Sequence, residues 1–234
     1  MRRIKRTAEA LRDVIFPSVC EVCGKSLVDG EDVMCLDCYA EIPRTRSHSD
    51  SFGVVHQRLA STLPIDRAAS FFFYYRENPY ARLIQKAKYN HLSRYASWLG
   101  RQYASEIVPD GFFDGVDMLV PVPLYWWKRF RRGYNQSVEV AKGIAEVTGL
   151  PVRDILSARR HSSQTAKSAF ERWQNTREVY SFNGCVAEIE NRHLLLVDDV
   201  ITTGATILSC GKAIHDASPT TRLSVISLGI TQLR

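Results

Sequence analysis

The stretch Leu194-Leu-Leu-Val-Asp-Asp-Val-Ile-Thr-Thr-Gly-Ala-Thr206 decides the predicted fold. Four aliphatic residues before Asp198 are typical of a strand buried on both faces, as in a parallel sheet. After the turn, the spacing of Ile207, Leu208 and Ile214 predicts a helix that packs back on that strand. The stretch therefore predicts a strand–turn–helix unit of an α/β fold.

The turn of this unit has the chemistry of an anion site. It lies at a helix N-terminus, where backbone N–H groups and the helix dipole favour an anion. Gly204 lets a phosphate approach the backbone closely, and hydroxyl donors come from Thr202, Thr203 and Thr206. Asp198 and Asp199 would repel an anion, but they suit a neighbouring diol or a magnesium ion. A phosphate cradle beside a diol clamp predicts a ribose 5-phosphate site.

The alternative to a binding site is a purely structural role, in which the acids and threonines only cap the helix. Both residue types are common at N-caps. Two adjacent acids after a buried strand, followed by Thr-Thr-Gly-Ala-Thr, form a more specific string than capping requires. We therefore favour the binding site.

Four cysteines near the N-terminus form a second motif. Cys20-Glu-Val-Cys23 and Cys35-Leu-Asp-Cys38 each present two thiolates, and together they predict a closed, structural four-cysteine Zn²⁺ site. Disulfides are the alternative. The basic N-terminus lacks the apolar segment of a secretory signal, so we expect a cytoplasmic, reducing location, which favours zinc.

These motifs carry two family resemblances. The acidic pair and its turn resemble the phosphoribosyl pyrophosphate (PRPP) motif of the type I phosphoribosyltransferases. The cysteines, preceded by Leu11-Arg-Asp-Val-Ile-Phe-Pro17, resemble the ComF family of competence-associated, phosphoribosyltransferase-like proteins. That family's most distinctive block is matched by Val120-Pro-Val-Pro-Leu124 and Arg132-Gly-Tyr-Asn-Gln136. The resemblance covers nearly the whole chain, from about residue 11 onward.

The resemblance implies roles for individual residues. Asp198 and Asp199 would hold the ribose hydroxyls and are the candidate catalytic residues. The 5-phosphate would bind Thr202, Thr203, Gly204, Ala205 and Thr206. The pyrophosphate would face the turn Val122, Pro123 and Leu124, with Mg²⁺ bound alongside PRPP. Some purine-salvage relatives carry an acid at the position of Thr202, so the motif here supplies no general base.

Two polar segments are further candidates. The run Lys128–Arg132 holds four cations in five residues, and Arg131 and Arg132 are candidates to bind pyrophosphate. A solvated basic face is the alternative. Residues 157–177 are polar with little periodicity, which favours a lid that excludes water. Its candidates to reach the ligand are Gln164, Lys167, Arg172 and Asn175.

Composition and hydrophobic periodicity predict the organisation of the rest of the chain. Its 234 residues, 45% of them hydrophobic, suffice for an α/β core with a small appendage, and alternating strands and helices predict a parallel sheet with helices on both faces. The family resemblance implies that this is a type I phosphoribosyltransferase-like fold with a small N-terminal zinc-binding module. We expect a basic N-terminal helix and zinc knuckle over 1–45, the main domain over 46–234, and no transmembrane segment. Residues 44–66 are expected to form linker and loop. Strands are expected at 69–75, 116–122, 193–197 and 223–230, and helices at 78–89, 95–108 and 137–148.

Three classes of function are compatible with these features. The protein would bind PRPP and support DNA uptake or natural transformation, or transfer phosphoribose to a nitrogen acceptor with release of pyrophosphate. A non-catalytic protein that handles single-stranded DNA is the alternative, since the net charge is +6 and aromatic residues flank the run Lys128–Arg132. A PRPP sensor is the third. The ComF resemblance implies partners such as a competence helicase or another DNA-uptake protein.

Overall fold

The computed structural model describes residues 18–50, 52–59, 63–75, 77–88, 93–160 and 178–232. The chain forms two compact units, Met1–Pro43 and Arg44–Arg234. The expected N-terminal helix lies outside the described residues, as do the lid candidates Gln164, Lys167, Arg172 and Asn175.

The smaller unit is built around its cysteines. An antiparallel bridge joins Val19 to Ser26, so the chain turns back just after Cys20. Helix α2 (Leu36–Ala40) begins directly after Cys35, which brings Cys38 round by one turn. Cys20, Cys35 and Cys38 are buried although the unit is small.

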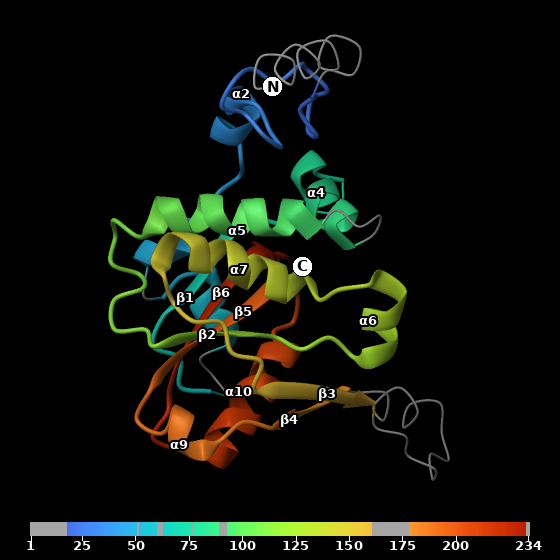
Figure 1. The fold of residues 1–234 in the computed structure, drawn as a ribbon. Coiled ribbons are helices and arrows are strands. Elements are labelled where there is room, and N and C mark those ends of the chain that lie inside the picture. Colours follow the sequence, from blue (N-terminus) through green and yellow to red (C-terminus); the bar gives the residue numbers. More distant parts are fainter. Residues whose placement is uncertain are drawn as a thin grey trace, which may run out of the picture. The chain divides into compact units, whose positions relative to one another are not determined.

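A four-stranded parallel sheet forms the centre of the larger unit (Figure 1). Its strands lie in the order β1 (Ala68–Phe73), β6 (Arg222–Ile230), β5 (His193–Ile201) and β2 (Met118–Pro121). The four residues of the run Leu194–Val197 are 0% exposed. A central parallel strand is covered on both faces, and this accounts for its uninterrupted aliphatic sequence.

Helices cover both faces of the sheet, as the sequence predicts. Helices α5 (Ser93–Ile107) and α7 (Gln136–Thr148) pack together on one face, where α7 contacts β2 and β5. On the other face, α3 (Val54–Leu59) and α10 (Ala205–Ala217) share a buried cluster with Leu194 and Leu196. The expected α/β class, with a separate four-cysteine module, is confirmed.

Shorter elements complete the larger unit. Strands β3 (Leu156–Arg160) and β4 (Glu178–Phe182) form an antiparallel pair apart from the main sheet. The other elements of this unit within the described residues are the 3₁₀ turn η1 (Ser47–Ser49), α4 (Pro79–Lys88), α6 (Trp126–Arg132) and α9 (Val186–Ile189).

Three expectations of secondary structure were wrong. Strand β5 does not end at Val197 but continues through both acids to Ile201, because β6 is equally long and pairs with it as far as Ile230. The segment expected to be loop before Asp66 contains η1 and α3. Tertiary burial forms α3 despite its β-branched start, since Val55 and Leu59 are both 0% exposed. Residues 157–160 of the expected lid pair in β3.

Candidate functional site

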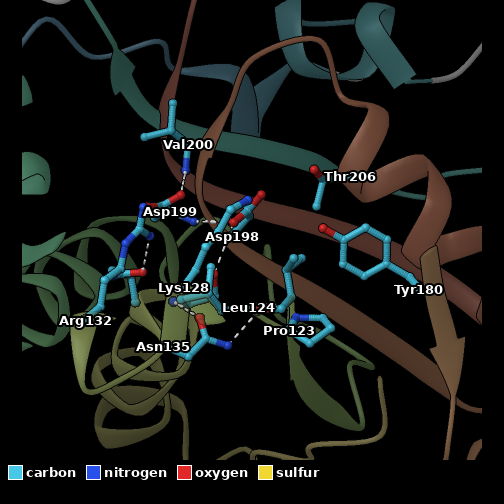
Figure 2. A pocket seen from close by; sticks show the side chains of 13 residues that line it. Pro123, Leu124, Lys128, Arg132, Asn135, Tyr180, Asp198, Asp199, Val200 and Thr206 are labelled. Carbon is cyan, nitrogen blue, oxygen red and sulfur yellow. Dashed lines mark hydrogen bonds between the residues drawn. The ribbon is translucent and has the colours of Figure 1, made fainter. Parts of the chain in front are cut away.

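A polar cavity of about 150 Å³ lies where β2 and β5 end (Figure 2). These strands are parallel neighbours, with Pro121 opposite Val197, so the residues that follow β2 lie beside Asp198 and Asp199 near the carboxyl end of β5. Of the predicted residues, the cavity is lined by Val122, Pro123, Leu124, Arg132, Asp198, Asp199 and Thr206. Segments 122–124 and 198–206, far apart in sequence, therefore contribute to one cavity.

The two acids are held by nearby donors. Asp198 is 8% exposed, and its Oδ1 accepts hydrogen bonds from Ser137 Oγ at 3.1 Å and from the Asp199 backbone N–H at 2.8 Å. Asp199 Oδ1 accepts from the Val200 backbone N–H at 2.7 Å. These bonds orient both carboxylates at the cavity, as a clamp for hydroxyl groups or a cation requires.

The turn after β2 is tied to the start of α7. Asn135 Nδ2 donates to the Val122 carbonyl at 2.8 Å, while Asn135 Oδ1 accepts from the Ser137 backbone N–H at 3.2 Å. The second bond is the N-cap of α7. One side chain therefore fixes the turn and the N-terminus of the helix side by side at the cavity.

The cations of α6 divide into two groups. Lys128 and Arg132 line the cavity, whereas Arg131 is exposed and lies outside its lining. Arg132 Nη1 donates to Gln136 Oε1 at 3.0 Å, which directs the guanidinium toward α7. Arg132 is thus better placed to meet an anion than Arg131.

The threonine-rich turn begins α10. Gly204 has φ 83° and is the N-cap residue of the helix. A Cβ added at Gly204 would lie 2.7 Å from Leu59 Cδ2, so the turn is packed closely against α3. Of its threonines only Thr206 lines the cavity, while Thr202 and Thr203 are exposed outside the lining. Buried Gly204 and exposed Ala205 also lie outside it.

Sequence reasoning missed several residues at the site. Asn135, Gln136, Ser137 and Tyr180 line the cavity, and Arg58 of α3 donates from Nη1 to the Thr202 carbonyl at 2.6 Å. Figure 2 shows Tyr180 and Thr206 on the opposite side of the cavity from Arg132 and Asn135. An asparagine just before a helical pattern indicates an N-cap, so Asn135 could have been placed at the start of the helix expected over 137–148. No sequence signal marks Tyr180.

The four cysteines of the smaller unit form a cluster that fits zinc. Their sulfur atoms all lie within 4.8 Å of one another, and Cys23 Sγ is 3.7 Å from Cys35 Sγ. A tetrahedral zinc site with Zn–S bonds near 2.3 Å needs sulfurs about 3.8 Å apart. Burial opposes ionisation of Cys20, but backbone hydrogen bonds involving Cys23, Cys35 and Val22 outweigh it and lower the pKa of this thiol to about 6. Burial and the neighbouring thiols raise the pKa of Cys38, so the thiols of the cluster do not ionise equally in the absence of a cation. The donor set is suited to a structural ion.

Several curated proteins are similar to this chain. The chain is 34% identical over 101 residues to Competence protein F of Haemophilus influenzae, covering 42% of this chain and 44% of that protein. It is 26% identical over 194 residues to DNA utilization protein YhgH of Escherichia coli K12, covering 81% and 80%. Competence protein ComFC of Streptococcus pneumoniae is 30% identical over 98 residues, covering 42% and 41%.

The chain is therefore a homologue of competence and DNA-utilization proteins. The resemblance to ComF proteins is confirmed. The matched region spans less than half the length of the Haemophilus and Streptococcus proteins and four fifths of YhgH. No family model matches the chain.

Solved structures give a weaker likeness. Glutamine PRPP amidotransferase from B. subtilis aligns with 56% of this chain and 25% of its own, at 24% identity and a TM-score of 0.36. A purine phosphoribosyltransferase from Pyrococcus horikoshii aligns with 57% of this chain and 83% of its own, at 8% identity and a TM-score of 0.36.

Within the described residues, no helix has the length and apolar character needed to cross a bilayer.

Proposed function

We propose that this protein binds PRPP, as its magnesium complex, in the cavity at the ends of β2 and β5, and that it supports DNA uptake. One observation carries the proposal: Asp198, Asp199 and Thr206 line the same cavity as the turn Val122–Leu124. The acids would bind the ribose hydroxyls and the first turn of α10 the 5-phosphate. The turn after β2, with Arg132, would face the diphosphate.

Charge supports this orientation of the ligand. The carboxylates of Asp198 and Asp199 repel phosphate oxygens, whereas Lys128 and Arg132 attract them. Magnesium prefers oxygen ligands and commonly binds through substrate phosphates with one or two carboxylates. The acids of β5 are suitable ligands of that kind.

The geometry suits transfer of the phosphoribosyl group. A nitrogen nucleophile would form a bond to the anomeric carbon as the bond from that carbon to the diphosphate oxygen breaks. Pyrophosphate would leave with the bonding electron pair, and the nitrogen would release its proton to water. Cations near the diphosphate would stabilise the charge that develops on the leaving group.

Calorimetric titration of the zinc-loaded protein with PRPP and magnesium tests the proposal. We expect binding in the wild type and its loss in the double variant Asp198→Asn/Asp199→Asn. Asp216→Asn is the matched control, because it removes an exposed carboxylate at the far end of α10 whose partner is Lys212. Wild-type protein that does not bind PRPP would overturn the proposal. If PRPP binds, candidate nitrogen acceptors are added next. Release of pyrophosphate would indicate an enzyme, and its absence would indicate a PRPP sensor.

A second candidate function rests on the surface of α6. The side chains of Trp126, Trp127 and Phe130 are 61%, 50% and 78% exposed, and Trp127 stacks on Phe130 with ring centroids 5.9 Å apart. Exposed rings interleaved with cations suit the bases and phosphates of single-stranded DNA. DNA handling would also agree with the names of the relatives.

Fluorescence anisotropy with a labelled single strand tests this candidate. Affinity should fall as salt rises, and the charge-removing variant Arg129→Gln/Arg131→Gln should weaken it while leaving PRPP affinity unchanged, because neither arginine lines the cavity. Salt-independent affinity, or equal affinity in the variant, would exclude α6 as the DNA surface.

A further inference from the structure

The first residue of α7 carries a buried amide to which the proposed function gives no role. Gln136 is 2% exposed and lines the cavity. Its Oε1 accepts the hydrogen bond from Arg132 Nη1 at 3.0 Å, which fixes the orientation of the amide. Among the described residues, no group accepts a hydrogen bond from Gln136 Nε2. A buried amide N–H without an acceptor destabilises a fold, so such a donor calls for a specific explanation.

The surroundings of Gln136 favour an anionic acceptor. Arg132 is its direct partner, and the next residue, Ser137, donates to Asp198 at 3.1 Å. Two contacts therefore tie the start of α7 to the cavity, one from Arg132 to Gln136 and one from Ser137 to Asp198, and all four residues line it. The N-terminus of α7, a helix of 13 residues, adds its dipole at the same place. Ligand oxygens with negative charge belong near Arg132 and its partner Gln136, and ligand hydroxyls belong near Asp198.

Tyr134 is the competing explanation for the buried amide. Burial and Glu139 raise the pKa of Tyr134, and Gln136 partly offsets that rise, so the amide is near enough to influence the phenol. However, the Tyr134 hydroxyl and Gln136 Nε2 share no hydrogen bond within the described residues, and both atoms are buried. Removing the Tyr134 hydroxyl therefore separates a role toward Tyr134 from a role toward a ligand.

We propose that Gln136 Nε2 donates a hydrogen bond to a diphosphate oxygen of PRPP, so that Gln136 distinguishes ligands with a diphosphate from ribose 5-phosphate. This inference rests on the proposed function and names one residue of that site. Arg132 holds the amide by its oxygen and leaves its nitrogen to the ligand. Gln136 is a binding residue, and the arrangement assigns it no part in proton transfer.

The test is calorimetric titration of the full-length, zinc-loaded protein with three probes: PRPP, pyrophosphate and ribose 5-phosphate, each with magnesium. Gln136→Leu removes the donor, and we expect it to weaken PRPP and pyrophosphate about tenfold while ribose 5-phosphate changes less than about twofold. Gln136→Glu keeps an acceptor for Arg132 but places an anion where the donor stood. It should weaken both diphosphate ligands at least as much as Gln136→Leu does. Tyr134→Phe should leave all three affinities within about twofold of wild type.

Each outcome decides a different point. Equal weakening of all three probes in Gln136→Leu, or wild-type affinity for pyrophosphate in Gln136→Glu, would overturn the inference and leave the proposed PRPP site standing. The same loss in Tyr134→Phe as in Gln136→Leu would assign the amide to Tyr134. Wild-type protein that binds none of the probes would overturn the proposed function, and the inference with it. Circular dichroism confirms that each variant is folded before its affinity is compared.

Discussion

Ser137 Oγ donates a hydrogen bond to Asp198 Oδ1 at 3.1 Å, and both side chains are buried. The contact joins the first turn of α7 to the carboxyl end of β5. Because the Asp199 backbone N–H donates to the same oxygen at 2.8 Å, two donors hold the plane of this carboxylate. Helix α7 therefore orients an acid that belongs to the sheet.

Ser137→Ala should remove one of the hydrogen-bond donors of this carboxylate. We expect PRPP affinity to fall about fivefold to tenfold and the free energy of unfolding to fall by about 1 kcal/mol, because one buried hydrogen bond is lost. Thr148→Val is the control, since it removes a hydroxyl that donates to the Ile144 carbonyl at 3.0 Å at the far end of the same helix. Calorimetry and urea denaturation measure the two effects. Unchanged PRPP affinity in Ser137→Ala would show that Asp198 needs no support from α7.

Gly204→Ala should damage both the stability of the fold and the turn that begins α10. Gly204 has φ 83°, and an added Cβ would lie 2.7 Å from Leu59 Cδ2, a side chain that is 0% exposed. Gly115→Ala is the matched control, because Gly115 has φ 73° but open space within 4 Å. We expect each variant to lose about 1–2 kcal/mol through backbone strain.

The two glycine variants should differ in ligand binding. Only Gly204→Ala should add a steric cost and weaken ribose 5-phosphate, because Gly204 begins the turn that carries the cavity-lining residue Thr206. Gly115 precedes β2, at the opposite end of that strand from the cavity. Urea denaturation and calorimetry compare the variants. Identical stabilities and affinities would mean that the contact with Leu59 does not shape this turn.

The arrangement of the main chain at the site could be predicted from the sequence. Leu194–Val197 and Met118–Val120 are apolar runs of parallel strands, and the carboxyl ends of parallel strands share one edge. That rule places Asp198 beside the turn Val122–Leu124 without knowledge of any side chain. The four-cysteine cluster could also be predicted, because two pairs of cysteines at this spacing are typical of the ligands of one zinc ion.

The directions of the side chains could not be predicted in this way. Thr202 and Thr203 were expected to face a phosphate, but the left-handed conformation at Gly204 belongs to a turn that leaves both exposed outside the cavity. Gln136 and Ser137 reach the cavity because α7 packs against β2 and β5, which no local pattern encodes. Tyr180 belongs to β4, which pairs with β3 outside the main sheet.

Removal of zinc should unfold the smaller unit and spare the larger one. The smaller unit has three buried cysteines among its few buried side chains, whereas the larger unit has its own core around the sheet. We expect one zinc per chain, loss of that zinc in Cys38→Ser, and a thermal transition of the larger unit that persists after chelation. Cys185→Ser, at an exposed cysteine outside the cluster, should retain the metal. Elemental analysis and calorimetric melting provide the readouts.

His193 should make the stability of the larger unit depend on pH. It is 2% exposed, and its Nε2 lies 2.8 Å from Ser224 Oγ. Burial lowers the pKa of His193, and the nearby charges of Arg222 and Arg67 lower it further, while Asp66 acts in the opposite direction. The folded protein therefore keeps this imidazole neutral at pH values where the unfolded chain protonates it.

The sign of the dependence follows from proton binding. Below about pH 6.5, the ordinary histidine value, the unfolded state binds more protons at His193 than the folded state, so stability falls as pH falls. The loss ends once the pH drops below the lowered folded-state pKa. Asp117, whose pKa is lowered mainly by a hydrogen bond from the His193 backbone, acts in a separate window near and below pH 4. Urea denaturation of wild type and His193→Gln between pH 7 and about pH 5 separates these effects. We expect the variant to be less stable at pH 7 but to show a flatter slope, and parallel slopes would assign the dependence to other groups.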